Sequence, residues 1–152
     1  GYNRWIINHF ADARIDARLL PPEDALGDWV DDFGCIWRQS TEGAPHIVKY
    51  ALIKPNLEGY MFPDLSNPER YKYIPEDISA NKDKFLVSGA GLLFFKTAWA
   101  LRGFDQILID SYLHPNFAEE LLDNLMELNI QMVEGITEYD IDAVLFSDDY
   151  GT

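Results

Sequence analysis

The longest regular pattern in the sequence is a run of apolar residues at three- and four-residue spacing between positions 117 and 136. Its members are Phe117, Leu121, Leu122, Leu125, Leu128, Met132, Val133 and Ile136. This spacing places the side chains on one face of an α-helix, and acidic residues occupy the opposite face. At about 1.5 Å per residue such a helix is about 30 Å long, which is enough to cross a sheet and return the chain. We predict that the helix begins at residues 114–116 and ends near Gly135.

Short apolar runs lie before and after this helix, at residues 84–88 and 143–146. Such runs are typical of parallel strands that are covered on both faces. Two further helices are predicted between them, over residues 92–102 and 104–113, with Gly103 ending the first. Because crossovers of this kind build parallel sheets, we predict that residues 84–152 form one strand–helices–strand unit.

The first third of the chain carries weaker patterns. Residues 1–32 are predicted to be a helical lead-in, because apolar and charged residues mix there in a helix-like way. Aromatic and β-branched residues flank a turn-forming segment, which predicts a β-hairpin over residues 33–53. A long loop over residues 54–66 follows, and Asn67 before Pro68 indicates a capped helix start.

The bulk properties fit one folded domain. The chain has 152 residues and a hydrophobic content of 47%, enough to bury a core. No apolar run approaches the roughly 20 residues that a membrane span needs. The single cysteine, Cys35, excludes an intrachain disulfide and favours a reducing compartment. We therefore expect a cytoplasmic protein.

The charge is unevenly distributed along the chain, whose net charge is −14. Residues 1–102 hold 14 acids and all 12 bases, whereas residues 103–152 hold 12 acids and no base. Because an acidic surface repels phosphates, we expect neither a nucleic-acid partner nor a membrane partner. The acidic half has three interpretations: a surface for a basic protein partner, a surface for a missing part of the same chain, and a solvated face that aids solubility.

Two adjacent carboxylates, Asp148 and Asp149, follow the last predicted strand. In α/β folds, chemistry gathers past the carboxyl ends of parallel strands, so these aspartates are the predicted catalytic residues, orienting substrate or accepting a proton. A solvated acidic loop, a helix cap and a Ca²⁺ or Mg²⁺ site are the alternatives. The predicted substrate-binding residues are Tyr150, Gly89, Gly91 and Trp99, with core packing the alternative for Trp99.

Several runs of the sequence resemble the uroporphyrinogen decarboxylase superfamily. They are residues 93–104 (LFFKTAWALRGF), 115–122 (PNFAEELL) and 142–152 (DAVLFSDDYGT). Residues 32–37 (DFGCIW) and 60–64 (YMFPD) are similar to a decarboxylase-like branch of it. That branch often has an acidic–basic pair where this chain has Lys96 and Thr97, which is a departure from the family.

The resemblance implies an α/β fold, a (β/α)8 TIM barrel of about twice this length, of which the chain would form roughly the first half. Such a piece exposes an open sheet edge, so it needs its missing half, a swapped arrangement or a second copy in a homodimer. The family implies one of two activities. One is cofactor-free decarboxylation of a porphyrinogen, a tetrapyrrole, and the other is methyl transfer to or from a corrinoid with the help of zinc.

Methyl transfer is the preferred interpretation. The family's decarboxylase signature is an arginine-rich loop that binds many carboxylates, and these residues do not match it. An acidic mouth suits a neutral methyl donor, or a corrinoid carrier protein with basic edges. A non-catalytic binding or scaffold protein on the same fold is the second alternative.

The metal ligands that methyl transfer would need are not predicted within these residues. The residues considered are His9, His46, His114 and Cys35. The histidines lie tens of residues apart, and no pair shares a helical turn. If zinc is used, its ligands are therefore expected beyond Thr152, and a true decarboxylase would need no cofactor.

Overall fold

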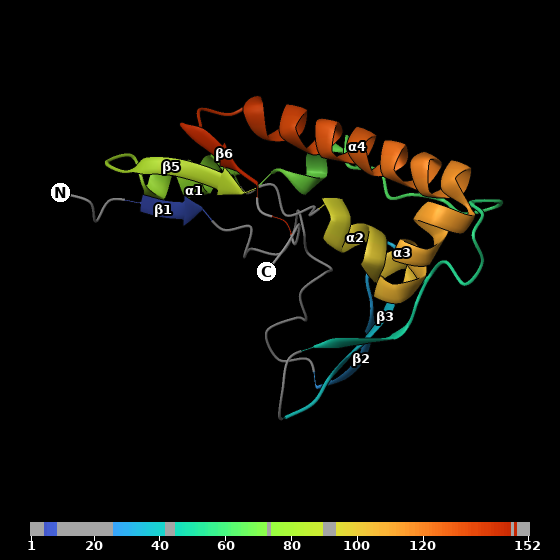
Figure 1. The fold of residues 1–152 in the computed structure, drawn as a ribbon. Coiled ribbons are helices and arrows are strands. Elements are labelled where there is room, and N and C mark those ends of the chain that lie inside the picture. The colour runs from blue at the N-terminus through green and yellow to red at the C-terminus, as the bar shows by residue number, and fades with distance from the viewer. Residues whose placement is uncertain are drawn as a thin grey trace.

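The computed structural model describes residues 5–8, 26–41, 45–72, 74–89, 94–146 and 148. Its elements are β1 (Trp5–Asn8), β2 (Gly27–Val30), β3 (Ile36–Gln39), β4 (His46–Lys49), the 3-10 helix η1 (Pro68–Arg70), α1 (Ile74–Ala80), β5 (Phe85–Gly89), α2 (Phe94–Arg102), α3 (Phe104–Leu113), α4 (Pro115–Thr137) and β6 (Ala143–Leu145). The strands form two separate three-stranded sheets. Figure 1 shows α4 running from α3 at one end of the molecule to the parallel sheet at the other.

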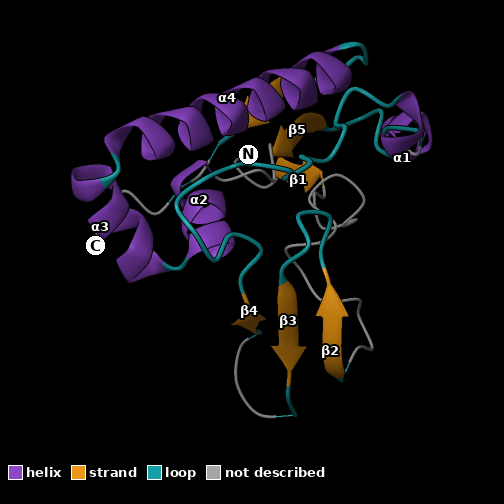
Figure 2. Cartoon of the chain, turned by 90° about the vertical axis from the view of Figure 1, so that its right-hand side faces the viewer, coloured by secondary structure: helices purple, strands orange, loops and turns teal. Residues whose placement is uncertain are grey.

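The first sheet is antiparallel, with strand order β2-β3-β4. Strands β3 and β4 confirm the predicted hairpin. Trp29 on β2 lies opposite Trp37 on β3, and the two rings stack with centroids 5.7 Å apart. Strand β2 lies inside the predicted helical lead-in, so that prediction is wrong there. Figure 2 shows this sheet projecting away from α4, on the far side of α2.

The second sheet is parallel, with strand order β1-β5-β6. Strands β5 and β6 confirm two predicted strands, and the helices between them confirm the predicted crossover. Strand β1 contradicts the helical lead-in a second time. Its residues Trp5, Ile6 and Ile7 are aromatic or β-branched and suit a strand once β5 is beside them. Residues 1–4 and 9–25 of the predicted helical lead-in lie outside the described residues.

The three long helices match their predictions closely. Gly103 has φ = 98°, which ends α2 and lets α3 begin in a new direction. Helix α4 buries its predicted apolar stripe, and Leu121, Leu125, Met132 and Ile136 are fully enclosed. Among the described residues, no helix combines the length and the apolar character that crossing a bilayer requires.

The hydrophobic core lies between the helices, the antiparallel sheet and the long loop after β4. Its most central members include Cys35, Trp37, Leu52, Leu65, Tyr71, Leu101, Leu121 and Leu125. Asn67 accepts a hydrogen bond from the N–H of Glu69, which confirms the predicted capped start at Pro68, although the helix there is the short η1. Helices α2 and α4 contribute many of the buried core residues.

The predicted fold, an α/β partial TIM barrel, is wrong. A half-barrel needs a run of parallel strands, each followed by a helix that packs on the strands. Between β1 and β5 the described residues instead form an antiparallel sheet, a long loop and short helices. Leu86 and Val87 of β5 are buried but lie outside the main core cluster. The resemblance failed as a guide to fold because local sequence runs do not determine how many strands share a sheet.

Candidate functional site

The carboxylate of Asp148 lies at the N-terminus of α2. The backbone N–H of Phe95 donates to Asp148 Oδ2 at 2.6 Å, and that of Lys96 donates to Oδ1 at 3.0 Å. The first N–H groups of a helix have no partner inside it, and the positive end of the helix dipole attracts anions. Asp148 therefore caps α2, although it lies 53 residues after Phe95 in the chain.

This contact defines a candidate site at the carboxyl edge of the parallel sheet. Gly89, the last residue of β5, pairs with Leu145, the last residue of β6. Asp148 follows β6 closely, and the first turn of α2 follows β5, so both meet at this edge. A carboxylate fixed by two backbone hydrogen bonds has a defined position, from which it can orient a substrate or accept a proton.

The other predicted site residues are only partly brought together. Gly89 lies at the edge just described. Trp99 is half-buried on α2 and packs against the hydrophobic core, as in the alternative interpretation of this residue. Asp149, Tyr150 and Gly91 lie outside the described residues. Asp148 itself has the helix-cap role that the sequence left open, although the capped helix precedes it in the chain instead of following it.

A second aspartate holds the start of β6 against β5. Asp142 Oδ2 accepts a hydrogen bond from the N–H of Leu86 at 2.7 Å, and the N–H of Asp142 donates to the carbonyl oxygen of Leu86 at 3.0 Å. The two ends of β6 are therefore each fixed by a carboxylate bonded to backbone N–H groups. Sequence analysis missed this role, because an aspartate before a strand resembles an ordinary turn residue.

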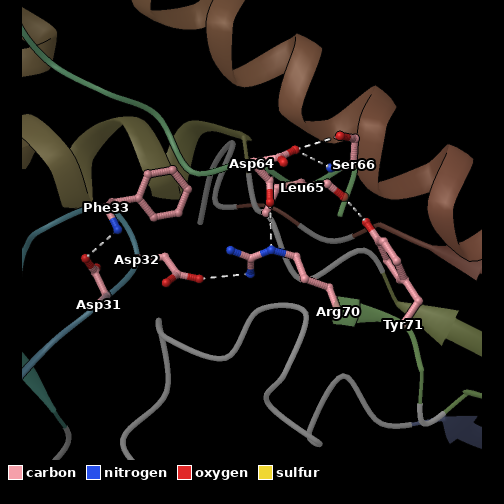
Figure 3. A network of polar contacts seen from close by, with 8 residues as sticks. All are labelled: Asp31, Asp32, Phe33, Asp64, Leu65, Ser66, Arg70 and Tyr71. Atoms are coloured by element: carbon pink, nitrogen blue, oxygen red, sulfur yellow. Dashed lines mark hydrogen bonds and ion pairs between the residues drawn. The ribbon is translucent and has the colours of Figure 1, made fainter. Parts of the chain in front are cut away.

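Figure 3 shows a separate polar network that joins the turn after β2 to the loop before η1. Arg70 Nη1 donates to Asp32 Oδ2 at 2.9 Å, and Arg70 Nε donates to the carbonyl oxygen of Asp64 at 2.7 Å. The Tyr60 hydroxyl also donates to the carbonyl oxygen of Phe33. Two of the runs that resemble the decarboxylase-like branch, residues 32–37 and 60–64, are thus in direct contact.

The turn after β2 is organised by the buried carboxylate of Asp31. Asp31 Oδ1 accepts from the N–H groups of Phe33 and Cys35 at 3.0 and 2.8 Å, and Oδ2 accepts from Trp37 Nε1 at 2.8 Å. Burial raises the pKa of Asp31 above its usual value, although these hydrogen bonds oppose the shift. Each bond holds the turn or the start of β3 in place, so this carboxylate acts structurally.

Cys35 does not have the properties of a nucleophile or a metal ligand. Its thiol is fully buried and donates to the carbonyl oxygen of Ala100 at 3.3 Å. Burial raises the pKa of the Cys35 thiol to about 12, so the reactive thiolate is scarce at neutral pH. Cys35 lies directly before β3 and acts as a small buried residue of the core.

The described residues do not fit a zinc ion. Among them, no group of three His, Cys, Asp or Glu side chains is close enough to hold a metal. His46 and His114 are both exposed, on β4 and between α3 and α4, whereas His9 lies outside the described residues. No chemistry of these residues is therefore assigned to a bound zinc.

A buried ion pair between α2 and α3 was not anticipated from the sequence. Arg102 Nε donates to Asp110 Oδ2 at 2.6 Å, and the two side chains are 8% and 3% exposed. Arg102 also reaches the carbonyl oxygen of Leu52 at 3.4 Å. Both residues lie in amphipathic helices, where a charged residue is normally assigned to the solvent side.

The loop after β4 contains a hollow of about 260 Å³, lined by Ala51, Leu52, Ile53, Lys54, Asn56, Glu58, Gly59 and Tyr60. None of the predicted site residues belongs to its lining. The hollow is open and small for a drug-sized ligand, since ligand pockets typically enclose about 300–1,000 Å³. The carboxyl edge of the parallel sheet is the better candidate, because a charged group is fixed there.

Comparison of the chain with protein-family models, with curated proteins and with solved structures gives no match.

Proposed function

We propose that this chain is part of an enzyme of the uroporphyrinogen decarboxylase superfamily, of the branch that transfers methyl groups to or from a corrinoid. The observation that carries the proposal is the capping of α2 by Asp148. It joins Phe95 and Lys96 to Asp148, and these residues belong to two of the runs that most resemble the family. These runs and the contact between them are what support the assignment to the family.

The arginine residues favour methyl transfer over decarboxylation. A porphyrinogen carries many carboxylates and needs unpaired cations to bind them. In the part of the chain that the structure describes, each arginine forms an ion pair with an aspartate: Arg38 with Asp28, Arg70 with Asp32 and Arg102 with Asp110. The decarboxylase is the second candidate, supported by the same sequence resemblance.

The proposed substrate is a small methyl donor, and the proposed partner is a protein that carries the corrinoid. Since the histidines and Cys35 are too widely spaced in the sequence to form a ligand set, we propose that any zinc ligands lie beyond Thr152. The single buried thiol of Cys35 favours a reducing compartment, so we propose a cytoplasmic location.

Within this chain, Asp148 is the proposed positioning or proton-accepting group, with Asp149 beside it and Tyr150 in the pocket wall. The capping hydrogen bonds hold Asp148 at the carboxyl edge of the sheet. Gly89 and Gly91 are proposed to leave room for the substrate near that edge. Trp99 supports α2 through its core contacts.

The test uses the full-length gene product and its Asp148→Asn variant. Asparagine removes the charge but keeps only one of the two acceptor oxygens that bond the N–H groups of Phe95 and Lys96, so one capping hydrogen bond is lost, and circular dichroism checks that the variant still folds. The assay measures methyl transfer to free cobalamin from a panel of small methyl donors, together with the zinc content per chain. We expect about one zinc per chain and a loss of activity of at least tenfold in Asp148→Asn.

Asp142→Asn is the matched control, because Asp142 also bonds a backbone N–H group but lies at the opposite end of β6. It is expected to keep most of the activity. Consumption of uroporphyrinogen without zinc would replace the proposal with the decarboxylase. Full activity in Asp148→Asn would remove Asp148 from the site, and no activity in any assay would favour the scaffold alternative.

A further inference from the structure

Helix α3 exposes most of its apolar side chains to solvent. The exposed fractions are 51% for Phe104, 48% for Leu108 and 85% for Tyr112, and these residues recur every four positions. They therefore form one stripe along the helix. Ile109 and Leu113, exposed to 45% and 61%, form a second stripe beside the first. We call these five residues the α3 face.

The α3 face is held in a fixed position from behind. The buried residues of α3 are Ile107 and Asp110, and Asp110 is bonded to Arg102 on α2 at 2.6 Å. The ring of Phe104 meets that of Phe95 edge to face, with centroids 6.1 Å apart. A rigidly mounted apolar surface loses little conformational entropy when a partner covers it.

The charge around the α3 face decides what chemistry suits a partner. Residues 103–152 carry 12 acids and no base, and the exposed Asp105 lies four positions before Ile109 on α3, so its carboxylate is beside the α3 face. A second copy of the chain would bring two acidic surfaces together, which is unfavourable. A partner that carries Lys and Arg beside an apolar strip would instead be attracted to the acidic residues at the edge of the α3 face.

We propose that the α3 face is the docking surface for an amphipathic helix of a partner protein that carries basic residues beside its apolar stripe. Exposed apolar patches rimmed by polar residues mark interaction sites. Two helices pack by fitting ridges of residues spaced by four into each other's grooves, and the α3 face presents such ridges. This docking role of the α3 face does not depend on which reaction the protein catalyses.

The binding test uses the 152-residue chain and three labelled peptides of about 18 residues, a length that can form a helix. The first peptide is amphipathic with Leu on one face and Lys and Arg beside it. In the second, every Lys and Arg is replaced by Glu, and the third has the composition of the first in scrambled order. Fluorescence anisotropy is expected to give at least about tenfold tighter binding for the first peptide, weakening as salt is raised.

The site is located with the double variant Leu108→Ser/Tyr112→Ser. It is expected to weaken binding of the first peptide at least about tenfold, because apolar anchors dominate such interfaces. The matched control is Ile53→Ser/Met61→Ser, which removes two loop residues exposed to 74% and 86% and lying outside the α3 face. This control variant is expected to bind the first peptide as tightly as the unmodified chain does. Circular dichroism checks that each variant unfolds as the unmodified chain does.

Equal binding of the acidic or scrambled peptide would overturn the inference, as would an unchanged affinity in Leu108→Ser/Tyr112→Ser. A native mass of two chains that returns to one in that variant would also overturn it, since the occupant would then be a second copy. If the peptide binds the 152-residue chain but not the full-length gene product, another segment of the same protein covers the face, and the inference is again wrong.

Discussion

Helices α3 and α4 follow each other directly, pack together and are both rich in apolar residues, yet they use those residues in opposite ways. Helix α4 encloses Leu121, Leu125, Met132 and Ile136 completely and turns its acids outward. Helix α3 turns most of its apolar residues outward and buries an aspartate, Asp110. The spacing of apolar residues therefore predicted the covered face of α4, whereas for α3 only the helix itself was predicted and not the face that packs on the core.

The two helices are held in place by different forces. Burial of an apolar stripe stabilises α4, at about 25 cal/mol per Å² of surface removed from water. The attachment of α3 depends on Ile107 and on the ion pair between Asp110 and Arg102. A buried ion pair fixes the orientation and alignment of two helices more than it adds to stability. Removing only one partner is nevertheless costly, because the other charge then stays buried and unpaired.

The largest effect is expected from Asp110→Ala, which leaves the Arg102 guanidinium buried without its carboxylate. The free energy of unfolding should fall by about 3–5 kcal/mol, measured by urea denaturation followed by circular dichroism. Asp105→Ala, at an exposed position of the same helix, should change it by less than about 0.5 kcal/mol.

A double variant, Arg102→Met/Asp110→Leu, tests whether the loss comes from the unpaired charge. Replacing both partners with apolar residues of similar size should recover most of the stability. If Asp110→Ala costs less than about 1 kcal/mol, the ion pair does not anchor α3, and the contrast between the two helices is mistaken.

The second prediction concerns the enclosed stripe of α4. Leu125→Ala leaves a cavity at a fully buried position, so the free energy of unfolding should fall by about 2–5 kcal/mol. The next residue is a matched control: Met126 is 50% exposed, and Met126→Ala should change stability by less than about 0.5 kcal/mol. Similar losses in both variants would show that α4 does not separate a buried from an exposed face.

Much of this arrangement was predictable from local sequence patterns. The extents of α3 and α4, the hairpin and the parallel pairing of β5 with β6 follow from spacing, turn composition and the crossover. Strand β1 was not predictable, because Trp5, Ile6 and Ile7 become a strand only when β5 supplies hydrogen bonds. The number of parallel strands was not predictable either, because no local pattern encodes it. The resemblance therefore led to the prediction of a barrel, which the structure contradicts.

The candidate site was predictable in position but not in its contacts. Asp148 was singled out because it follows a buried strand, and it does lie at the carboxyl edge of the parallel sheet. Its bonds to Phe95 and Lys96 join segments more than fifty residues apart, and no local pattern encodes such a pairing. The pairing of Arg102 with Asp110 was missed for a different reason, since charged residues are expected on the solvent side of helices.

A third prediction examines how tightly α4 is packed near its end. Alanine normally stabilises a helix by about 1 kcal/mol over glycine. A Cβ atom at Gly135 would overlap the ring of Tyr71, which is 2% exposed and held by its bond to the carbonyl oxygen of Leu65. Gly135→Ala should therefore lower the free energy of unfolding by about 1–3 kcal/mol.

The control for this prediction combines Gly135→Ala with Tyr71→Leu and is compared with Tyr71→Leu alone. The smaller side chain removes the overlap, so the alanine should then be neutral or stabilising by up to about 1 kcal/mol. A stabilising effect of Gly135→Ala in the unmodified chain would mean that the Tyr71 ring moves aside easily, and that α4 is less closely packed than its buried stripe suggests.

The smallest effect is expected on the α3 face, where Leu108→Ser/Tyr112→Ser should change the free energy of unfolding by less than about 0.5 kcal/mol per substitution. Both side chains are extensively exposed, at 48% and 85%, so truncation removes little buried apolar surface. The urea experiment that detects the loss in Leu125→Ala provides the scale. A loss above about 2 kcal/mol would mean that these residues are covered within the folded chain, and α3 would then resemble α4 instead of contrasting with it. A small loss would mean that the apolar residues of α3 do not stabilise the isolated fold, so that they differ from the buried stripe of α4 and stay available to another surface.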